Sequence, residues 1–239
     1  MTETWCPDAG APTADVRVGV AVPAAGSGTR MGGVPKPFVD LLGEPVLLHA
    51  LRPFLADRRV VSIVVALSPD EAADPPHWIG ALDPRVGVVA GGGTRGASVL
   101  LALTALPEDV DVIAVHDAAR PLVSEEVVRA CIDVAACGLG AVAGSPAIDT
   151  LKTVDPEGFV LTTPDRSTLW HAHTPQVFPA ALLRRAYRVV GVTHTDDAAL
   201  VEHVGGRIRM IDDGASNMKV TRPEDVAIAE AILSARSAS

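Results

Sequence analysis

A loop of small residues followed by two cations is the first segment of the sequence in which chemistry is expected. Pro23 to Gly32 reads Pro-Ala-Ala-Gly-Ser-Gly-Thr-Arg-Met-Gly and follows the apolar run 16–22. Small side chains let backbone N–H groups approach phosphate oxygens closely. Arg30 and Lys36 add two cations, and prolines on both sides of Lys36 restrict its backbone to extended conformations. The segment therefore predicts a polyphosphate site.

Two familiar phosphate-binding motifs do not fit this loop. The Walker A motif needs Lys and then Ser or Thr after its last glycine, whereas Val34 and Pro35 follow Gly33. The dinucleotide fingerprint needs glycine at the position of Met31. A purely structural turn remains an alternative for the loop, and a solvated loop lysine remains one for Lys36.

A carboxylate and further cations follow later strand-like runs. Asp117 comes after the apolar run 112–115, so we expect it at the mouth of a ligand crevice, the usual place for a hard-cation ligand that bridges to phosphates. Arg120 lies on the same loop, and Lys219 precedes the last helical segment. The alternative for Asp117 is a helix cap. His116 is expected to be structural, because no proton-transfer partner lies near it in the sequence.

The segments that must position these groups alternate between buried strands and amphipathic helices. The strands are predicted at 16–22, 60–67, 86–89, 112–115 and 207–211, with a further short apolar run at 140–144. The helices are predicted at 45–55, 98–106, after Ser124, and at 180–190 and 197–204. This order is typical of an α/β fold with a single Rossmann-like, doubly wound, mostly parallel sheet and helices on both faces. Such sheets bind ligands at the carboxyl ends of their strands.

Residues 145–174 interrupt the pattern with polar residues, Pro and Gly. Alternating polar and apolar residues around the turn 155–158 predict a protruding β-hairpin arm at about 146–172. We expect the arm to be inserted into one domain, 16–236, which follows a flexible extension at 1–15. A surface hairpin without a partner is the alternative for the arm.

Charge and composition exclude several classes of function. The net charge of −9 argues against a nucleic-acid surface and against binding to an anionic membrane, although cations that converge on one cleft can still hold a polyanion. The N-terminus has neither a basic start nor an apolar run, and no membrane span is present, so we expect a cytoplasmic protein. Cys131 and Cys137 match neither a zinc spacing nor a disulfide framework, and reduced, buried thiols are expected.

The motifs together resemble a known family. The segment Ala24-Ala25-Gly26-x-Gly28-x-Arg30-Met31 with Pro35-Lys36 is similar to the signature of sugar-phosphate nucleotidyltransferases. Later segments resemble the 2-C-methyl-D-erythritol 4-phosphate cytidylyltransferase family of the non-mevalonate isoprenoid pathway, in the family's order over about residues 16–234: Gly91-Gly92-Gly93-Thr94-Arg95-x-x-Ser98-Val99, His116-Asp117-Ala118-Ala119-Arg120-Pro121, Trp170-His171-Ala172-x-Thr174-Pro175-Gln176, Thr195-Asp196-Asp197 and Asn217-Met218-Lys219-Val220-Thr221.

The resemblance implies an activity and a role for each motif. The activity would be transfer of CMP from CTP to 2-C-methyl-D-erythritol 4-phosphate with release of pyrophosphate. Arg30, Lys36 and Lys219 would be the catalytic cations around the α-phosphate, and Asp117 would hold Mg²⁺ or another divalent cation. The nucleotide would contact Pro23, Ala24, Ala25, Gly26, Ser27, Gly28, Gly92, Gly93, Ser98 and Ala118. The polyol phosphate would contact Asp117, Arg120, Thr150, Arg166, Thr195 and Lys219, with the arm of a homodimer partner supplying Thr150 and Arg166.

Some alternatives stay open within this resemblance. Gly93 stands where the family commonly has an acidic residue, and Gly96-Ala97 stands where bulkier polar residues are usual, so selectivity for CTP is less firmly predicted than nucleotide binding. Other readings are a cytidylyltransferase for another polyol phosphate, such as ribitol 5-phosphate, and a non-catalytic nucleotide-binding regulator. A simple helix N-cap is the alternative for Thr195. Because the sequence ends at Ser239, no fused second enzyme of the pathway is expected.

Overall fold

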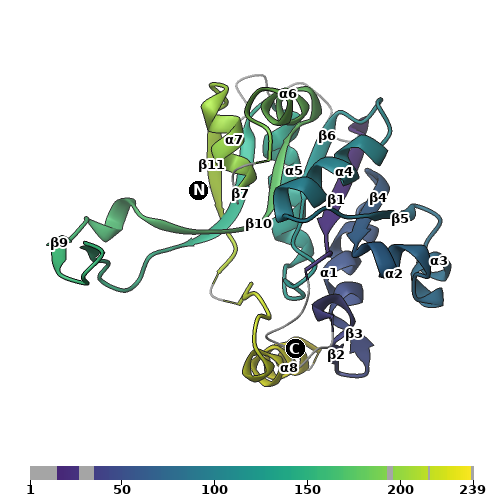
Figure 1. Ribbon diagram of the computed structural model, residues 1–239, viewed down its shortest axis with the longest axis horizontal. Coiled ribbons are helices and arrows are strands. Elements are labelled where there is room, and N and C mark those ends of the chain that lie inside the picture. Colours follow the sequence, from purple (N-terminus) through teal and green to yellow (C-terminus); the bar gives the residue numbers. More distant parts are fainter. Residues whose placement is uncertain (1–14, 27–34, 193–195, 215, 238–239) are drawn as a thin grey trace.

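A seven-stranded, mostly parallel sheet organises the chain (Figure 1). The computed structural model describes residues 15–26, 35–192, 196–214 and 216–237. The strand order is β11-β7-β10-β6-β1-β4-β5, and β10 runs antiparallel to both of its neighbours. The strands are β1 (Val18–Pro23), β4 (Val60–Leu67), β5 (Val86–Ala90), β6 (Val112–Val115), β7 (Gly140–Pro146), β10 (Trp170–Pro179) and β11 (Ile208–Asp212). The predicted doubly wound α/β fold is thereby confirmed.

Helices cover both faces of this sheet, which is why its central strands are apolar on both sides. Successive residues of a strand point to opposite faces, so Val20 packs in one core and Ala21 in the other. The helices of the first core are α1 (Val46–Leu55), α3 (His77–Leu82) and α5 (Glu125–Ala136). Those of the second core are α4 (Arg95–Ala105), α6 (Ala180–Val190) and α7 (Asp197–His203). The two cores hold the carboxyl ends of the parallel strands in register.

Four elements differ from the sequence predictions. The helix expected from Ser98 begins at Arg95, because Thr94 is its N-cap and accepts a hydrogen bond from the Ala97 amide. Strand β10 was not predicted at all, since residues up to 174 were expected to be an excursion from the sheet. Its first residues are exposed and its later ones buried, so neither strict alternation nor a continuous apolar run marks it. The short helix α2 (Pro69–Ala73) and helix α3 were also missed.

A third, small core attaches the C-terminal helix α8 (Pro223–Ser237) below the sheet (Figure 1). The same core also contacts the short strand pair β2 (Asp40–Leu41) and β3 (Glu44–Pro45). This pair follows a 3-10 turn at Lys36–Phe38. The buried members of the core are Leu41, Val46, Leu122, Val220 and Ala229. Because Val220 belongs to this core, the adjacent Lys219 is held close to the carboxyl ends of the strands.

The predicted arm is present and projects away from the sheet (Figure 1). Strands β8 (Thr153–Val154) and β9 (Val160–Thr162) pair antiparallel, and a 3-10 turn at Arg166–Thr168 leads back to β10. The carboxylate of Asp155 accepts hydrogen bonds from the amides of Glu157 and Phe159 and so closes the hairpin turn. The turn residue Gly158 has a φ of 90°, a conformation that glycine adopts without strain.

Two expectations from composition have different outcomes. Cys131 is a free, buried thiol, as predicted. Cys137 is disulfide-bonded, so the expectation of a reduced thiol is wrong there. Among the helices in the described ranges, none is long and apolar enough to cross a membrane.

Candidate active site

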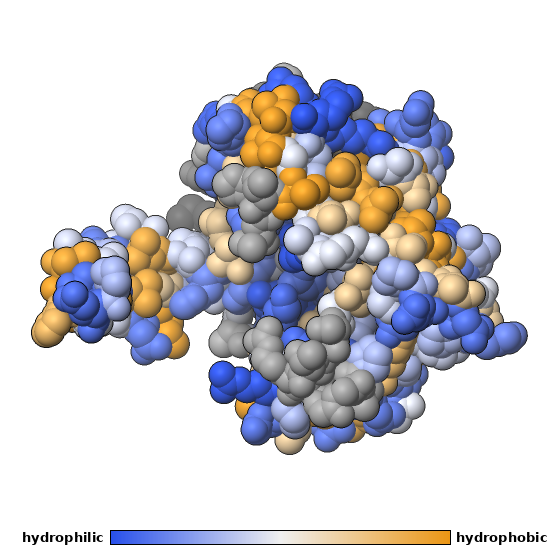
Figure 2. All heavy atoms as spheres, in the orientation of Figure 1, coloured by the Kyte–Doolittle hydropathy of each residue, from blue (hydrophilic) through white to orange (hydrophobic). Residues whose placement is uncertain are grey.

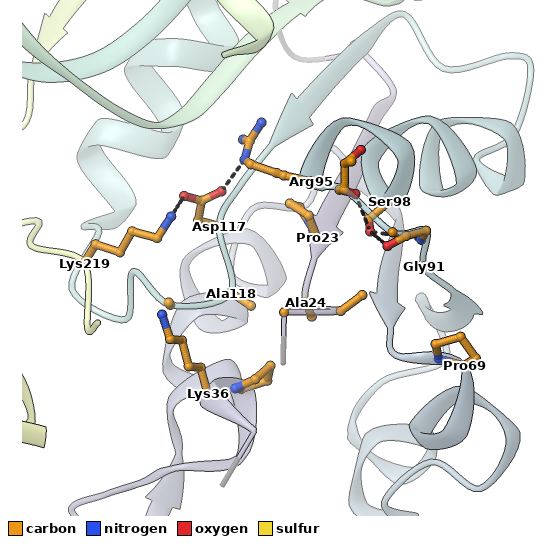
Figure 3. Close-up of a pocket in the computed structure, with 17 residues that line it drawn as sticks. Pro23, Ala24, Lys36, Pro69, Gly91, Arg95, Ser98, Asp117, Ala118 and Lys219 are labelled. Atoms are coloured by element: carbon orange, nitrogen blue, oxygen red, sulfur yellow. Dashed lines mark hydrogen bonds and ion pairs between the residues drawn. The ribbon is translucent and has the colours of Figure 1, made fainter. Parts of the chain in front are cut away.

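A cavity of ≈ 670 Å³ opens where β1, β5 and β6 end (Figure 3). Three segments that follow strands form most of its wall. The wall also includes the segment before β2 and the segment before α8. The lining residues are Pro23, Ala24, Ala25, Gly26, Lys36, Pro37, Pro69, Gly91, Gly92, Gly93, Thr94, Arg95, Ser98, Asp117, Ala118, Ala119 and Lys219. This is the edge at which doubly wound sheets bind their ligands.

The two ends of the cavity differ in charge. Lys36, Arg95, Asp117 and Lys219 gather at one end, as Figure 3 shows. The other end is formed by prolines, alanines, glycines and the hydroxyl residue Ser98. A ligand with an anionic part and a neutral, planar part would fit this division.

Asp117 is shared by two cations. Its Oδ2 accepts a hydrogen bond from Lys219 Nζ at 2.7 Å, and its Oδ1 accepts one from Arg95 Nε at 2.9 Å. Burial alone would raise the pKa of this carboxyl, but the charges of Arg95 and Lys219 outweigh burial and hold the pKa below its usual range. Asp117 therefore stays ionised at neutral pH.

Asp117 is also the carboxylate in this cavity that could hold a metal ion. The described part of the chain contains no group of three or more His, Cys, Asp or Glu side chains placed to bind a metal. Each oxygen of a carboxylate keeps a further lone pair when it accepts one hydrogen bond. Mg²⁺ often binds through one or two carboxylates together with substrate phosphates. The donor set fits that mode of binding and does not fit a cage made by the protein alone.

A buried hydrogen-bond chain fixes the backbone around Asp117. The Asp117 amide donates to Thr174 Oγ1 at 3.0 Å, and the Thr174 hydroxyl donates to His116 Nδ1 at 3.3 Å. His116 Nε2 lies 3.1 Å from the Arg120 carbonyl oxygen. Because a carbonyl only accepts, Nε2 must carry the proton and Nδ1 must be the acceptor. Burial lowers the pKa of His116 to about 4, so the ring is neutral and structural, as expected.

The glycine loop after β5 lies close against the loop after β1. The Gly91 amide donates to the Leu67 carbonyl oxygen at 2.7 Å. A Cβ atom on Gly91 would lie 2.6 Å from the Cβ of Ala25, so a larger residue would push the two loops apart. The Ser98 hydroxyl accepts from the Gly92 amide at 3.1 Å, and it lies 3.1 Å from the Thr94 carbonyl oxygen, to which it can donate. Ser98 is thus occupied in shaping the loop.

The segment that carries Lys219 is fastened directly to the Asp117 loop. The Val220 amide donates to the Ala119 carbonyl oxygen at 2.8 Å, and Arg120 Nη1 donates to the Asn217 carbonyl oxygen at 2.6 Å. These two bonds, together with the third core, explain how a lysine from the end of the chain reaches a carboxylate 102 residues earlier.

The cavity brings together many of the residues that the sequence singled out, and it leaves others aside. Those that line it are Pro23, Ala24, Ala25, Gly26, Lys36, Gly92, Gly93, Ser98, Asp117, Ala118 and Lys219. Ser27, Gly28, Arg30 and Thr195 lie outside the described residues. Arg120 does not line the cavity, because its guanidinium group is turned to Asn217. Thr150 and Arg166 are exposed on the arm, where Arg166 donates to the Ile148 carbonyl oxygen.

No role for Arg95 was predicted from the sequence, although the motif that contains it contributes to the family resemblance. Arg95 is the first residue of α4, where the positive end of the helix dipole disfavours a cation. A cation at the start of a helix could therefore have indicated that a carboxylate lies close to Arg95 and compensates its charge. The partners Asp197 and Thr174 were missed because they belong to distant segments of the chain.

Comparison of the sequence with protein families gives a match over most of the chain. The family described as 2-C-methyl-D-erythritol 4-phosphate cytidylyltransferase matches residues 18–235. The enzyme of that name from Symbiobacterium thermophilum is 43% identical over 222 residues, which cover 91% of this chain and 93% of the relative. Its namesake from Streptomyces avermitilis is 41% identical over 232 residues, with 92% and 93% covered.

Solved structures are similar over nearly the same range. The crystal structure of 4-diphosphocytidyl-2C-methyl-D-erythritol synthase from Anaerococcus prevotii has a TM-score of 0.82 at 25% identity, covering 92% of this chain and 97% of that one. The 2-C-methyl-D-erythritol 4-phosphate cytidylyltransferase from Thermus thermophilus has a TM-score of 0.73 at 32% identity, with 91% and 98% covered.

The buried imidazole of His116 predicts a pH dependence of stability. Its pKa of about 4 in the folded chain lies below the 6.5 of an ordinary histidine, so between these values the unfolded chain binds the extra proton. Stability is therefore unaffected by this group above pH 6.5 and falls as the pH is lowered. We expect a loss of roughly 2 kcal/mol from this group between pH about 7 and about 5.

Urea unfolding of the wild type and of His116→Gln at both pH values measures this effect. Glutamine keeps an N–H donor for the Arg120 carbonyl oxygen but does not titrate, so the variant should lack this part of the pH dependence. Equal slopes of stability against pH in the two proteins would show that His116 titrates normally.

Proposed function

Because the chain belongs to the 2-C-methyl-D-erythritol 4-phosphate cytidylyltransferase family, we propose that it transfers the CMP group of CTP to 2-C-methyl-D-erythritol 4-phosphate. The products are 4-diphosphocytidyl-2-C-methyl-D-erythritol and pyrophosphate. The observation that carries this proposal is the cavity at the strand ends, where Lys36, Arg95 and Lys219 converge beside the carboxylate of Asp117. The chain is thus a nucleotidyltransferase.

The uneven charge of the cavity orients the nucleotide. The cationic end suits the triphosphate, and the neutral end around Gly91 to Gly93 suits the cytosine and ribose. There, small residues let the planar base lie against the backbone.

The reaction needs no nucleophile or base from the protein. An oxygen of the acceptor's phosphate, which is ionised at neutral pH, attacks the α-phosphorus and forms the new P–O bond. The bond from the α-phosphorus to the bridging oxygen breaks, and pyrophosphate leaves with its electron pair. Lys36 and Lys219 hold the reacting groups in line and offset the negative charge, which is how proteins catalyse phosphoryl transfer. We assign the same task to Arg30.

We further propose that Asp117 holds a divalent cation, Mg²⁺, together with phosphate oxygens of the nucleotide. When bound, such a cation neutralises phosphate charge and polarises the P–O bonds. Lys219 has a partly exposed side chain, so it can turn from Asp117 toward a phosphate when the nucleotide arrives.

We propose that the arm makes the enzyme a homodimer. The arm exposes large apolar side chains, with Ile148 78%, Phe159 69% and Leu161 63% exposed, and Figure 2 shows apolar residues on this lobe. Exposed apolar patches of this kind mark contact surfaces. Thr150 and Arg166 lie on the arm outside the cavity of their own chain, so they would contact the acceptor phosphate in a partner's site. Arg120 and Thr195 remain candidates for the same phosphate.

An assay of pyrophosphate release tests the activity. The purified chain should release pyrophosphate from CTP with 2-C-methyl-D-erythritol 4-phosphate faster than with ribitol 5-phosphate, and chelation of divalent cations should stop the reaction. Lys36→Ala and Lys219→Ala should each lower kcat by about 10² to 10³ because each removes a preorganised cation. The exposed Arg188 of α6 provides the control Arg188→Ala, which should leave kcat unchanged. Normal turnover in both lysine variants would contradict the mechanism.

Mixing two damaged chains tests the shared site. Lys219→Ala impairs the cavity of its own chain, whereas Arg166→Ala impairs the arm that serves the partner. A mixed dimer then keeps one intact site, so refolding equal amounts together should restore up to about a quarter of wild-type activity in a two-fold symmetric dimer. Light scattering on the wild type should give twice the chain mass of 24.7 kDa. A monomeric mass, or no recovery of activity, would refute the shared site.

The neutral end of the cavity predicts how selectivity can be changed. A Cβ on Gly93 would meet no atom within 4 Å, and cytosine carries an amino group where uracil has an oxygen. Gly93→Asp adds an acceptor for that amino group and should raise the preference for CTP over UTP in kcat/KM about tenfold. Gly93→Ala, which adds no acceptor, is the matched control. An unchanged CTP to UTP ratio in Gly93→Asp would place the base elsewhere.

A further inference from the structure

Arg95 bridges two buried carboxylates from different parts of the chain. Its Nε donates to Asp117 Oδ1 at 2.9 Å, and its Nη1 donates to Asp197 Oδ2 at 2.8 Å. Asp197 is the first residue of α7 and is 1% exposed. Its second oxygen accepts a hydrogen bond from the hydroxyl of Tyr187 on α6. A continuous chain of contacts therefore runs from Tyr187 through Asp197 and Arg95 to the carboxylate in the cavity.

The two cations that hold Asp117 differ in their own attachments. Lys219 is 39% exposed in its side chain and extends from an irregular segment, whereas Arg95 is 24% exposed and carries a second ion pair deep in the protein. Lys219 can leave Asp117 for a phosphate without abandoning a buried partner. Arg95 cannot leave without stranding Asp197, and an unpaired buried carboxylate is strongly unfavourable. Arg95 is thus the fixed cation and Lys219 the exchangeable one.

Packing alone does not account for Asp197. The surrounding core of α4, α6 and α7 is apolar, and an apolar pair there would join these helices without the cost of desolvating two charges. Burial raises the pKa of Asp197, so its surroundings oppose the charge that Arg95 needs as a partner. Among the described residues, the side chains that hydrogen-bond to this carboxylate are Arg95 and Tyr187.

We infer that Asp197, supported by Tyr187, is a positioning residue for the transfer reaction: it fixes Arg95 and, through Arg95, the Asp117 carboxylate, so that Lys219 is the cation released to the substrate phosphates. The kinetic consequences of this inference rest on the proposed function. The placement of Arg95 and Asp117 by Asp197 does not depend on that function. Neither Asp197 nor Tyr187 lines the cavity, so both act through Arg95.

The variant Asp197→Asn tests the inference by kinetics. The amide removes the charge that holds Arg95 while keeping the shape of the side chain. We expect kcat to fall about 10²-fold, because small displacements of catalytic groups cost this much, and KM for CTP to change by less than about threefold. Tyr187→Phe, which leaves the Arg95–Asp197 pair in place, should give a smaller fall in kcat.

A matched control exists at the opposite end of the sheet. Arg59, just before β4, also bridges two carboxylates, Asp57 and Asp133, and Arg59 is buried. Asp57→Asn should lower the unfolding temperature, as Asp197→Asn does, and leave kcat unchanged. If Asp197→Asn loses stability like this control and keeps wild-type kcat, Asp197 is merely structural and the inference is wrong.

A coupling measurement and a crystal structure complete the test. Because Asp197 acts through Arg95, the double variant Arg95→Gln/Asp197→Asn should have the same kcat as Arg95→Gln alone, and additive losses would contradict the inference. A structure of Asp197→Asn should show Arg95 displaced from Asp117. An unchanged Arg95–Asp117 contact in that structure would overturn the inference, whatever the activity of the variant. An inactive wild type would instead overturn the proposed function, and the Arg95–Asp117 contact would then decide the inference alone.

Discussion

The site depends on one shared carboxylate. Asp117 accepts hydrogen bonds from Lys219 and Arg95, and these cations come from segments that lie far apart in the sequence. Without the carboxylate, like charges facing one cavity would repel each other and favour an open arrangement. With it, the cations are gathered at the cavity before any phosphate is present, so Lys219 has to turn only a short way when the substrate binds. The rest of the fold can be understood as the support for this contact.

Three different supports converge on it. Strand β6 delivers Asp117 to the edge of the sheet, and the neutral His116 fixes the loop that follows by its bond to the Arg120 carbonyl oxygen. Helix α4 delivers Arg95 at its first turn. The third core and the bond from the Val220 amide deliver Lys219. Since each support is mainly apolar packing or backbone bonding, the charges themselves need not hold the protein together.

Local signals in the sequence predicted the fold well, and signals that depend on distant contacts were missed. Strands 60–67 and 112–115 and helix 180–190 were predicted with their observed bounds, because each is continuously apolar or strongly amphipathic. Strand β10 was missed because half of it belongs to the exposed arm. Asp117 and Lys219 were recognised from their places in motifs. The contacts of Arg95 with Asp197 and of Arg120 with Asn217 were not predicted, because these partners follow by 102 and 97 residues and no spacing rule relates such positions.

The negative net charge of the chain explains why the positions of the cations in the cavity matter. The chain carries a net charge of −9, so its overall charge opposes the approach of a nucleoside triphosphate, although salt screens this repulsion beyond about 10 Å. Among the described residues that line the cavity, the cations Lys36, Arg95 and Lys219 outnumber the carboxylate Asp117, and the formal charge stays positive when Asp197, the second partner of Arg95, is included. Long-range steering cannot supply affinity here. Attraction of the nucleotide therefore begins only at the cavity mouth. The positions of Lys36, Arg95 and Lys219 then decide both binding and transfer, and the buried Asp197 fixes one of these cations, Arg95.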